Sequence, residues 1–273
     1  MRQFILTNRY GQTYNVTERE KTFLGNVAGL GFSSALTMYR VNDRYNIIAD
    51  ELEEQEISGE VYFTSENRRN DYREFVLFCR MRPLTLSYQY EGHTFYRSVN
   101  VKAIDKAETS PRMAGVTMQA LSPWYERVYI ATEADQGDGK RYDYRYDYTY
   151  ISVISMNLSL RSDTTEASPC RLIINGPVEN PVWYHYVNGV LVGRGGVTGE
   201  VLEGERLIVS SLDYTMDRVD SGGTLVQDMY PLRNFGEEGF IFLGYGENLI
   251  TVAHDGTNDV KLEMEAYLEY VSV

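Results

Sequence analysis

One segment of this 273-residue chain repeats its apolar residues with the period of an α-helix, and it limits the folds open to the chain. Charged side chains surround the apolar positions of this segment, and Pro83 disfavours helical backbone at the residue before it. We therefore predict a helix over residues 67–81. No other segment repeats apolar residues at helical spacing, so a mainly β protein is expected. The apolar positions follow the spacing i, i+3, i+4 and i+7, and they are Tyr72, Phe75, Val76 and Cys79.

The first half of the chain alternates apolar and polar residues on both sides of the predicted helix. Phe4 and Leu6 alternate before a turn at residues 8–11, and Tyr14 and Val16 alternate after it, which is the pattern of a β-hairpin. Strands around a single helix fit a small α+β barrel or sandwich. The other predicted strands are 57–64, with Gly59 as a bulge, the hairpin strands 84–90 and 95–101, and 115–121.

Two stretches of the chain are harder to assign. Residues 17–56 contain Gly29, Gly31 and an acidic run over 50–56, and we interpret them as a long excursion from the sheet. Residues 125–139 include the polar, Gly-rich sequence 135–139, which we interpret as an exposed loop at or near a domain boundary.

The second half of the chain shows only strand-like patterns. Gly, Asp and Asn punctuate these patterns at short intervals, as in a β-sandwich or jelly roll. The candidate strands are 170–175, 182–187, 206–211, 224–227, 240–243, 248–254 and 259–270.

Charge divides unevenly between the two halves. Residues 1–125 carry equal numbers of basic and acidic side chains, so the whole net charge of −13 comes from residues 126–273. This step predicts two domains, residues 1–130 and 131–273. It also argues against a protein that binds nucleic acid specifically, because neutralising phosphates requires a basic surface.

Tyrosine is unusually frequent, with 23 residues, and five of them form a ladder. In a strand, a spacing of two places every ring on one face, whereas helical spacing scatters them. These rings, with Trp183 and Tyr184 further along, suit either protein interfaces or stacking on sugar rings. Trp183 and Tyr184 face opposite ways in a strand and make no single platform. The ladder consists of Tyr142, Tyr144, Tyr146, Tyr148 and Tyr150.

Catalytic and metal-binding patterns are missing from the sequence. The three histidines lack a nucleophile motif such as G-x-S-x-G, and no His or Cys pair has the spacing of metal ligands. Nothing singles out a pair of carboxylates for hydrolysis. We therefore predict no catalytic residue, no cofactor and no metal site. Cys79 and Cys170 could form one disulfide, but two buried thiols are the better expectation.

No segment approaches the ~18–20 uninterrupted apolar residues of a membrane span, so we expect no membrane insertion. The N-terminal apolar stretch is too short for a secretory signal. The chain is therefore expected to fold in the compartment where it is made.

The order of several short motifs resembles the siphophage-type distal tail proteins (Dit). The resemblance covers nearly the whole chain, although the tyrosine ladder has no counterpart in the family and 244–246 replaces the family's Pro-Gly turn. The motifs are Phe4-Ile5-Leu6 with Asn8 and Gly11, residues 29–32, residues 57–63, the helix with Tyr72 and Phe75, Leu84, Arg97, Leu121-Ser122-Pro123-Trp124, residues 174–177 with 180–181, Asn188-Gly189, residues 204–209 and residues 242–248.

The resemblance implies a fold and an assembly. An N-terminal split β-barrel with one helix is followed by a galectin-like β-sandwich. Six N-terminal domains form a ring around a channel for DNA exit, between the tail tube and the tip or baseplate hub. The C-terminal domains point outward, where receptor-binding proteins attach. Such a protein is assembled in the bacterial cytoplasm and belongs to the virion tail. An arm from residues 17–56 would suit the clasping of a neighbouring copy.

Two other functions stay open at this point. A carbohydrate-binding module would hold sugar on the aromatic residues of the second half. A hydrolase acting on cell-wall polymer would need two essential carboxylates, and the sequence nominates none.

Overall fold

The computed structural model describes residues 2–17, 21–106, 112–132, 156–164, 167–256 and 260–273. The chain divides into two compact units: unit 1 is residues 1–126 with 270–273, and unit 2 is residues 127–269. Strands dominate both units, and the described residues contain one α-helix. The mainly β fold expected from the sequence is thereby confirmed.

Unit 1 is an antiparallel sheet with one helix against it. Its strands pair in the order β3-β6-β9-β8-β7-β1-β2, while β4 and β5 form a two-stranded sheet of their own. The elements are β1 (Gln3–Asn8), β2 (Thr13–Asn15), β3 (Thr22–Ala28), β4 (Ser34–Val41), β5 (Arg44–Leu52), β6 (Glu56–Phe63), α1 (Arg68–Cys79), β7 (Leu84–Tyr90), β8 (His93–Asp105) and β9 (Met113–Ala120).

The predicted hairpins and helix of unit 1 are confirmed. β1 pairs with β2 so that Leu6 lies opposite Tyr14, and β7 pairs with β8 across the turn at Glu91 and Gly92. The helix α1 falls within the predicted range.

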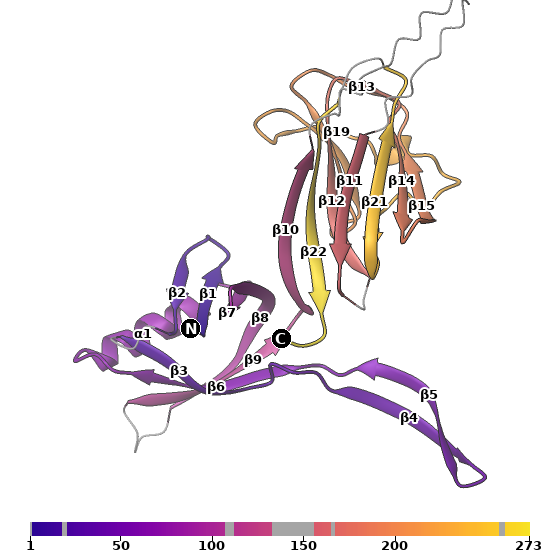
Figure 1. Cartoon of the computed structure of the whole chain (residues 1–273). Coiled ribbons are helices and arrows are strands. Elements are labelled where there is room, and N and C mark those ends of the chain that lie inside the picture. Colours follow the sequence, from indigo (N-terminus) through magenta and orange to yellow (C-terminus); the bar gives the residue numbers. More distant parts are fainter. Residues whose placement is uncertain (1, 18–20, 107–111, 133–155, 165–166, 257–259) are drawn as a thin grey trace, which may run out of the picture. The chain divides into compact units, whose positions relative to one another are not determined.

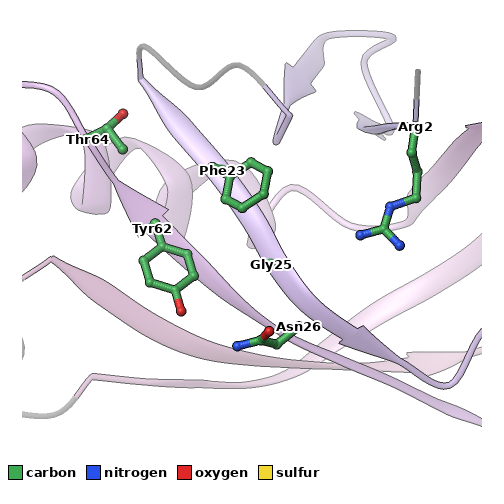
Figure 2. A pocket seen from close by; sticks show the side chains of 6 residues that line it. All are labelled: Arg2, Phe23, Gly25, Asn26, Tyr62 and Thr64. Carbon is green, nitrogen blue, oxygen red and sulfur yellow. The ribbon is translucent and has the colours of Figure 1, made fainter.

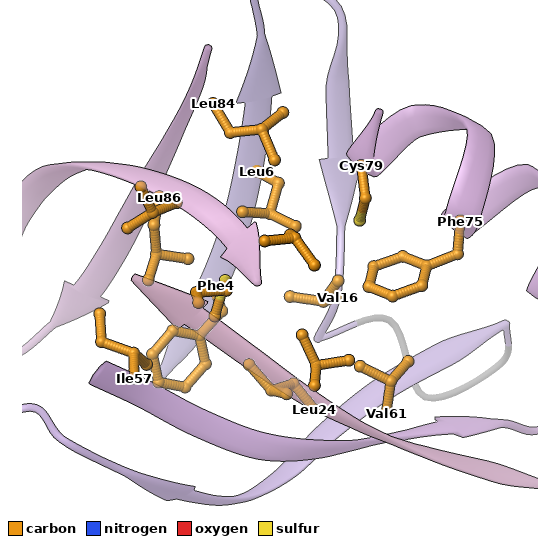
Figure 3. Close-up of a cluster of buried hydrophobic side chains, with 14 of the residues drawn as sticks. Phe4, Leu6, Val16, Leu24, Ile57, Val61, Phe75, Cys79, Leu84 and Leu86 are labelled. Carbon is orange, nitrogen blue, oxygen red and sulfur yellow. The ribbon is translucent and has the colours of Figure 1, made fainter. Parts of the chain in front are cut away.

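The core of unit 1 lies between the sheet and α1 (Figure 3). Alternate residues of β1 point into it, and Phe75 and Phe78 of α1 pack at ring-centroid distances of 5.5 and 5.4 Å from Tyr14. The described strands do not close a barrel. Instead, Val16 links β1 to the outer strand β3, since its N–H donates to the Phe4 carbonyl and its own carbonyl accepts from the Leu24 N–H.

The predicted bulge at Gly59 is wrong. The pairing of β6 with β9 is regular through Gly59, and the bulge lies in β3, where the two residues between Gly25 and Ala28 stand opposite Gly59. Gly59 serves close packing instead, because a Cβ there would lie 2.9 Å from Leu24 Cδ1 and 3.2 Å from the Gly25 carbonyl oxygen.

Gly29, which follows β3, offers a test of backbone packing. Its φ is +86°, and a Cβ there would lie 2.0 Å from the Glu56 carbonyl oxygen. We expect Gly29→Ala to lower the free energy of unfolding by roughly 2 kcal/mol or more. Gly11→Ala is the matched control, since Gly11 has a φ of +74° and no atom near its Cβ position. If urea unfolding showed the same loss of unfolding free energy for Gly29→Ala and Gly11→Ala, the packing argument would be contradicted.

Unit 2 consists of two antiparallel sheets. One has the strand order β19-β18-β17-β12-β22-β10, and the other has the order β11-β21-β14-β15. The short strands β13 and β16 pair with each other, and β20 pairs with β12. The elements are β10 (Trp124–Thr132), β11 (Met156–Ser162), β12 (Ser168–Asn175), β13 (Val178–Glu179), β14 (Val182–Val187), β15 (Val190–Gly196), β16 (Glu200–Val201), β17 (Arg206–Ser210), β18 (Thr215–Val219), β19 (Leu225–Asp228), the 3-10 helix η1 (Tyr230–Leu232), β20 (Phe242–Leu243), β21 (Gly246–Ala253) and β22 (Leu262–Tyr270).

The two sheets of unit 2 meet around Gly239. Trp183 of β14 donates its indole N–H to the Gly239 carbonyl at 2.9 Å. A Cβ at Gly239 would lie 2.9 Å from the terminal methyl of Met216 in β18. Side chains from both sheets are therefore in one core, as expected for the second half.

Two further expectations can be compared with the structure. Residues 124–132 form strand β10, which takes in the first part of the stretch 125–139, and the loop predicted at 135–139 is not tested. Residues 133–139 lie outside the described part. Cys79 and Cys170 are both free and buried, and burial raises the pKa of each thiol to about 12.

Candidate contact surfaces

The hairpin β4–β5 is the most exposed apolar element of unit 1, and we call residues Ser34–Leu52 the hairpin arm (Figure 1). Backbone bonds hold its two strands together, and the Glu53 N–H donates to the Ser33 carbonyl at its root. At its tip, Asn42 and Asp43 both have positive φ values, which is the geometry of a two-residue type I′ turn. The hairpin arm corresponds to the excursion expected within residues 17–56.

Large apolar side chains cover the hairpin arm and face solvent. Met38 lies directly opposite Ile47, and Arg40 lies opposite Tyr45, with its guanidinium 6.0 Å from the tyrosine ring. Seven large hydrophobic residues of the arm are 46–68% exposed: Leu36, Met38, Tyr39, Val41, Tyr45, Ile47 and Ile48. A two-stranded ribbon is marginally stable alone, and contiguous exposed apolar surface marks an interaction site.

Unit 2 exposes a second apolar surface, which we call the aromatic patch. It consists of Tyr214, Tyr230, Phe235, Phe240 and Phe242. Tyr214 packs edge-on against Phe240, which stacks with Tyr230 at a centroid distance of 6.0 Å. Arg233 joins Phe235 to the group, because its guanidinium lies 3.8 Å from the Tyr230 ring centroid and 4.3 Å from that of Phe235. Tyr, Phe and Arg are the residues that interfaces favour.

A shallow cavity of about 640 Å³ lies on the face of β3 and β6 that is turned away from the core (Figure 2). Phe23 and Tyr62 stand 6.3 Å apart there. Glu60 already accepts hydrogen bonds from the Asn26 amide and the Tyr62 hydroxyl. The cavity therefore offers two aromatic rings together with the side chain of Arg2.

The aromatic residues singled out in the sequence differ in burial, and five of them are not described by the structure. Tyr142, Tyr144, Tyr146, Tyr148 and Tyr150 lie outside the described residues. Trp183 is 1% exposed and belongs to the core of unit 2. Tyr184, on the opposite face of β14, is half-buried, with the Arg194 guanidinium 5.2 Å from its ring. The aromatic patch was not predicted, because its rings come from separate loops and strands.

The three histidines occupy separate places in the fold. His93 lies 3.2 Å from the Glu126 carboxylate, and the Nδ1 of His254 accepts the Gly256 N–H. His185 is buried, and its Nε2 lies 3.0 Å from the Asn248 side-chain oxygen. No group of three His, Cys, Asp or Glu residues that could hold a metal ion occurs among the described residues. Within the same residues, no helix is long and apolar enough to cross a membrane.

Burial of His185 gives the protein a pH dependence. Desolvation lowers the pKa of His185 in the folded state, opposed by the hydrogen bond to Asn248. As pH falls below about 6.5, the unfolded chain binds this proton first, so the folded state loses stability. Above that pH the His185 imidazole is neutral in both the folded and the unfolded state, so its contribution to stability no longer changes with pH.

We expect His185→Gln to flatten the fall in melting temperature between neutral and mildly acidic pH. The exposed His93→Gln variant is the control. The slope is compared rather than the absolute melting temperature, because the substitution also changes buried packing. An unchanged slope for His185→Gln would disprove this assignment.

Both units expose apolar side chains on β-strands and on the loops between them. Residues 3–119 match the family model described as the distal tail protein, N-terminal domain. The N-terminal part of the chain is therefore similar to the N-terminal domain of the distal tail proteins. No curated protein matches the chain.

Solved structures resemble the whole fold. A chain of the phage p2 baseplate, in its activated conformation with Sr, has a TM-score of 0.66 at 15% identity and full coverage of both chains. The Dit protein of phage SPP1 is described as a paradigm of the hub adsorption apparatus in phages that infect Gram-positive bacteria. It has a TM-score of 0.63 at 11% identity, over 96% of this chain and 98% of that one. The similarity extends beyond the N-terminal domain, so unit 2 shares the fold of these proteins as well.

Proposed function

We propose that this protein forms a homohexameric ring in a phage tail tip, linking the tail tube to the baseplate hub, and that it catalyses no reaction. The match of residues 3–119 to the N-terminal domain of the distal tail proteins supports the location. The observation that carries the ring is the hairpin arm, an apolar ribbon that leaves both of its faces in solvent.

The hairpin arm supports a ring because of the way rings close. In a cyclic ring each copy presents one surface to the next copy and a different surface to the previous one. An arm that extends from its own sheet can lie on a neighbour, and covering its apolar side chains stabilises both partners. The arm therefore forms half of a heterologous contact.

The ring surrounds a channel through which DNA leaves. A channel for passage must not hold its cargo, and phosphates bind to clustered basic side chains. Residues 1–125 have no net charge and the rest of the chain is acidic, which suits passage without retention.

The aromatic patch of unit 2 serves as the contact for another tail protein, such as a receptor-binding protein. Its rings support one another by mutual packing, so little side-chain freedom is lost on binding. Glycan binding by the same rings is the alternative function. Titration of cell-wall polysaccharide into the full chain separates the two: heat of binding that is lost in Tyr214→Ser would favour the glycan.

The ring is tested by measuring the mass of the full chain. Size-exclusion chromatography with light scattering at micromolar concentration is expected to give six times the chain mass, and negative-stain microscopy is expected to show annular particles. A monomer throughout the concentration series would reject the proposal.

A further inference from the structure

A small cavity of about 280 Å³ lies at the root of the hairpin arm. Glu53, Glu54 and Gln55, which connect β5 to β6, form part of its wall, together with Arg97 of β8 and residues 120–123. The backbone bond from Glu53 to Ser33 closes the arm at this place. The cavity therefore adjoins the surface that we assign to self-association.

Arg97 is a buried cation near the root of the hairpin arm. It is 4% exposed, and it makes no ion pair with any carboxylate among the residues described. Its Nε donates to the Ser122 carbonyl at 2.8 Å, and its guanidinium lies 5.3 Å from the Trp124 ring centroid. Burial lowers the pKa of Arg97 to about 10. A buried charge with no partner is costly, and a ligand of opposite charge removes that cost.

Further polar atoms around Arg97 also lack partners. The Nη1 of Arg97, the indole Nε1 of Trp124 and the side-chain oxygen of Gln55 are all buried and make no hydrogen bond. Arg97 and Gln55 both line the cavity, and the Trp124 ring lies behind the Arg97 guanidinium. Turning the Gln55 amide over would place a second N–H donor beside that of Arg97. Buried polar groups are nearly always paired, so three such atoms together indicate a missing group.

The chemistry of the cavity selects a carboxylate. A guanidinium binds a carboxylate through two parallel hydrogen bonds, and the remaining N–H group suits a further lone pair. A dianion such as phosphate is disfavoured because Glu53 and Glu54 lie in the wall. We propose that the cavity beside Arg97 receives the side-chain carboxylate of an Asp or Glu from the neighbouring copy in the ring.

A second copy is the natural source of that carboxylate. Residues 1–125 carry as many acidic as basic side chains, so unit 1 of a neighbouring copy presents carboxylates of its own. An isolated copy leaves the site incomplete, and only a neighbour held by the hairpin arm brings an acid to the same place in every subunit. This inference rests on the proposed ring.

The two tryptophans allow a direct test of carboxylate binding. With 5-fluorotryptophan, Trp124 reports on the cavity, while the indole of Trp183 is already bonded to Gly239 and serves as the internal control. Sodium acetate, compared with sodium chloride at equal ionic strength, is titrated into the chain diluted below its assembly concentration. We expect the Trp124 fluorine signal to shift saturably, with no shift in Arg97→Gln. A shift that follows ionic strength alone, or that survives in Arg97→Gln, overturns the site.

Self-association tests the source of the carboxylate. We expect Arg97→Gln to raise the concentration needed for ring formation about tenfold or more, and Arg97→Lys to raise it less, because lysine keeps the charge but not the paired hydrogen bonds. The exposed Arg112→Gln is the matched control. Rings that form equally well in Arg97→Gln reject the inference and leave the proposed function intact. Absence of rings in the unaltered chain rejects both. Melting temperatures of all variants establish that each is folded.

Discussion

Replacing both Met38 and Ile47 with glutamate will leave unit 1 folded and abolish ring formation. The two residues lie opposite each other on the hairpin arm and are 51% and 59% exposed in the single chain. Changes at exposed positions typically alter stability by no more than about 0.5 kcal/mol. In an assembled ring the same positions would be covered, and burying two unpaired carboxylates is strongly unfavourable.

We expect self-association to weaken by at least about a hundredfold, or roughly 3 kcal/mol. Light scattering over a concentration series measures it, and circular dichroism checks the fold. The matched control is Leu77→Glu, which changes another half-exposed apolar residue of unit 1, on α1. Rings at wild-type concentration in the double variant would exclude the hairpin arm as the contact.

Deleting the hairpin arm tests its role in ring formation independently, provided that the ends of the deletion follow the pairing of β4 with β5. Ser34 lies opposite Leu52, so residues 35–51 can be replaced by a short turn without changing the neighbouring strands. A longer deletion that reaches Glu56 would remove the first residue of β6, which pairs with Gln119 of β9. Loss of rings in that longer deletion would also be explained by damage to the sheet, so it would not test the hairpin arm alone.

Trp183→Ala will destabilise unit 2 severely. The indole is 1% exposed and donates to the Gly239 carbonyl, so the substitution leaves both a cavity and an unpaired carbonyl. Replacing a buried tryptophan by alanine costs about 3–5 kcal/mol. Denaturant unfolding followed by circular dichroism measures the loss.

The neighbouring Tyr184→Ala is the control, since that ring is half-buried on the opposite face of β14, and we expect a loss of about 1 kcal/mol. The comparison separates a core role for Trp183 from a glycan platform. A surface platform would lose sugar binding with little change in stability. If Trp183→Ala unfolded at the same denaturant concentration as the wild type, the assignment of Trp183 to the core would be contradicted.

Features that depend on neighbouring residues could be predicted from the sequence. The helix followed from four apolar residues at helical spacing, and it ends at Cys79, before Pro83. The hairpins β1–β2 and β7–β8 followed from alternation on both sides of turn residues. Each of these elements makes its hydrogen bonds within itself or with the next segment of the chain, so its signal is local.

Strands that rely on distant partners were less visible. The segment 190–196 contains three glycines and showed no strand pattern, yet it forms β15 because it pairs along β14. The residues of β11 likewise pair with β21, far along the chain. Backbone pairing with a partner strand can override weak local propensity.

The sequence by itself determined a mainly β chain with one helix, and it carried the motif order that resembles the distal tail proteins. Only the tertiary structure decided which apolar residues are buried. Ile47 and Trp183 both lie in β-strands, but the first is exposed on the hairpin arm and the second is enclosed by two sheets. Alternation specifies which side chains share a face of a strand, whereas the burial of that face depends on segments that fold against it from elsewhere in the chain.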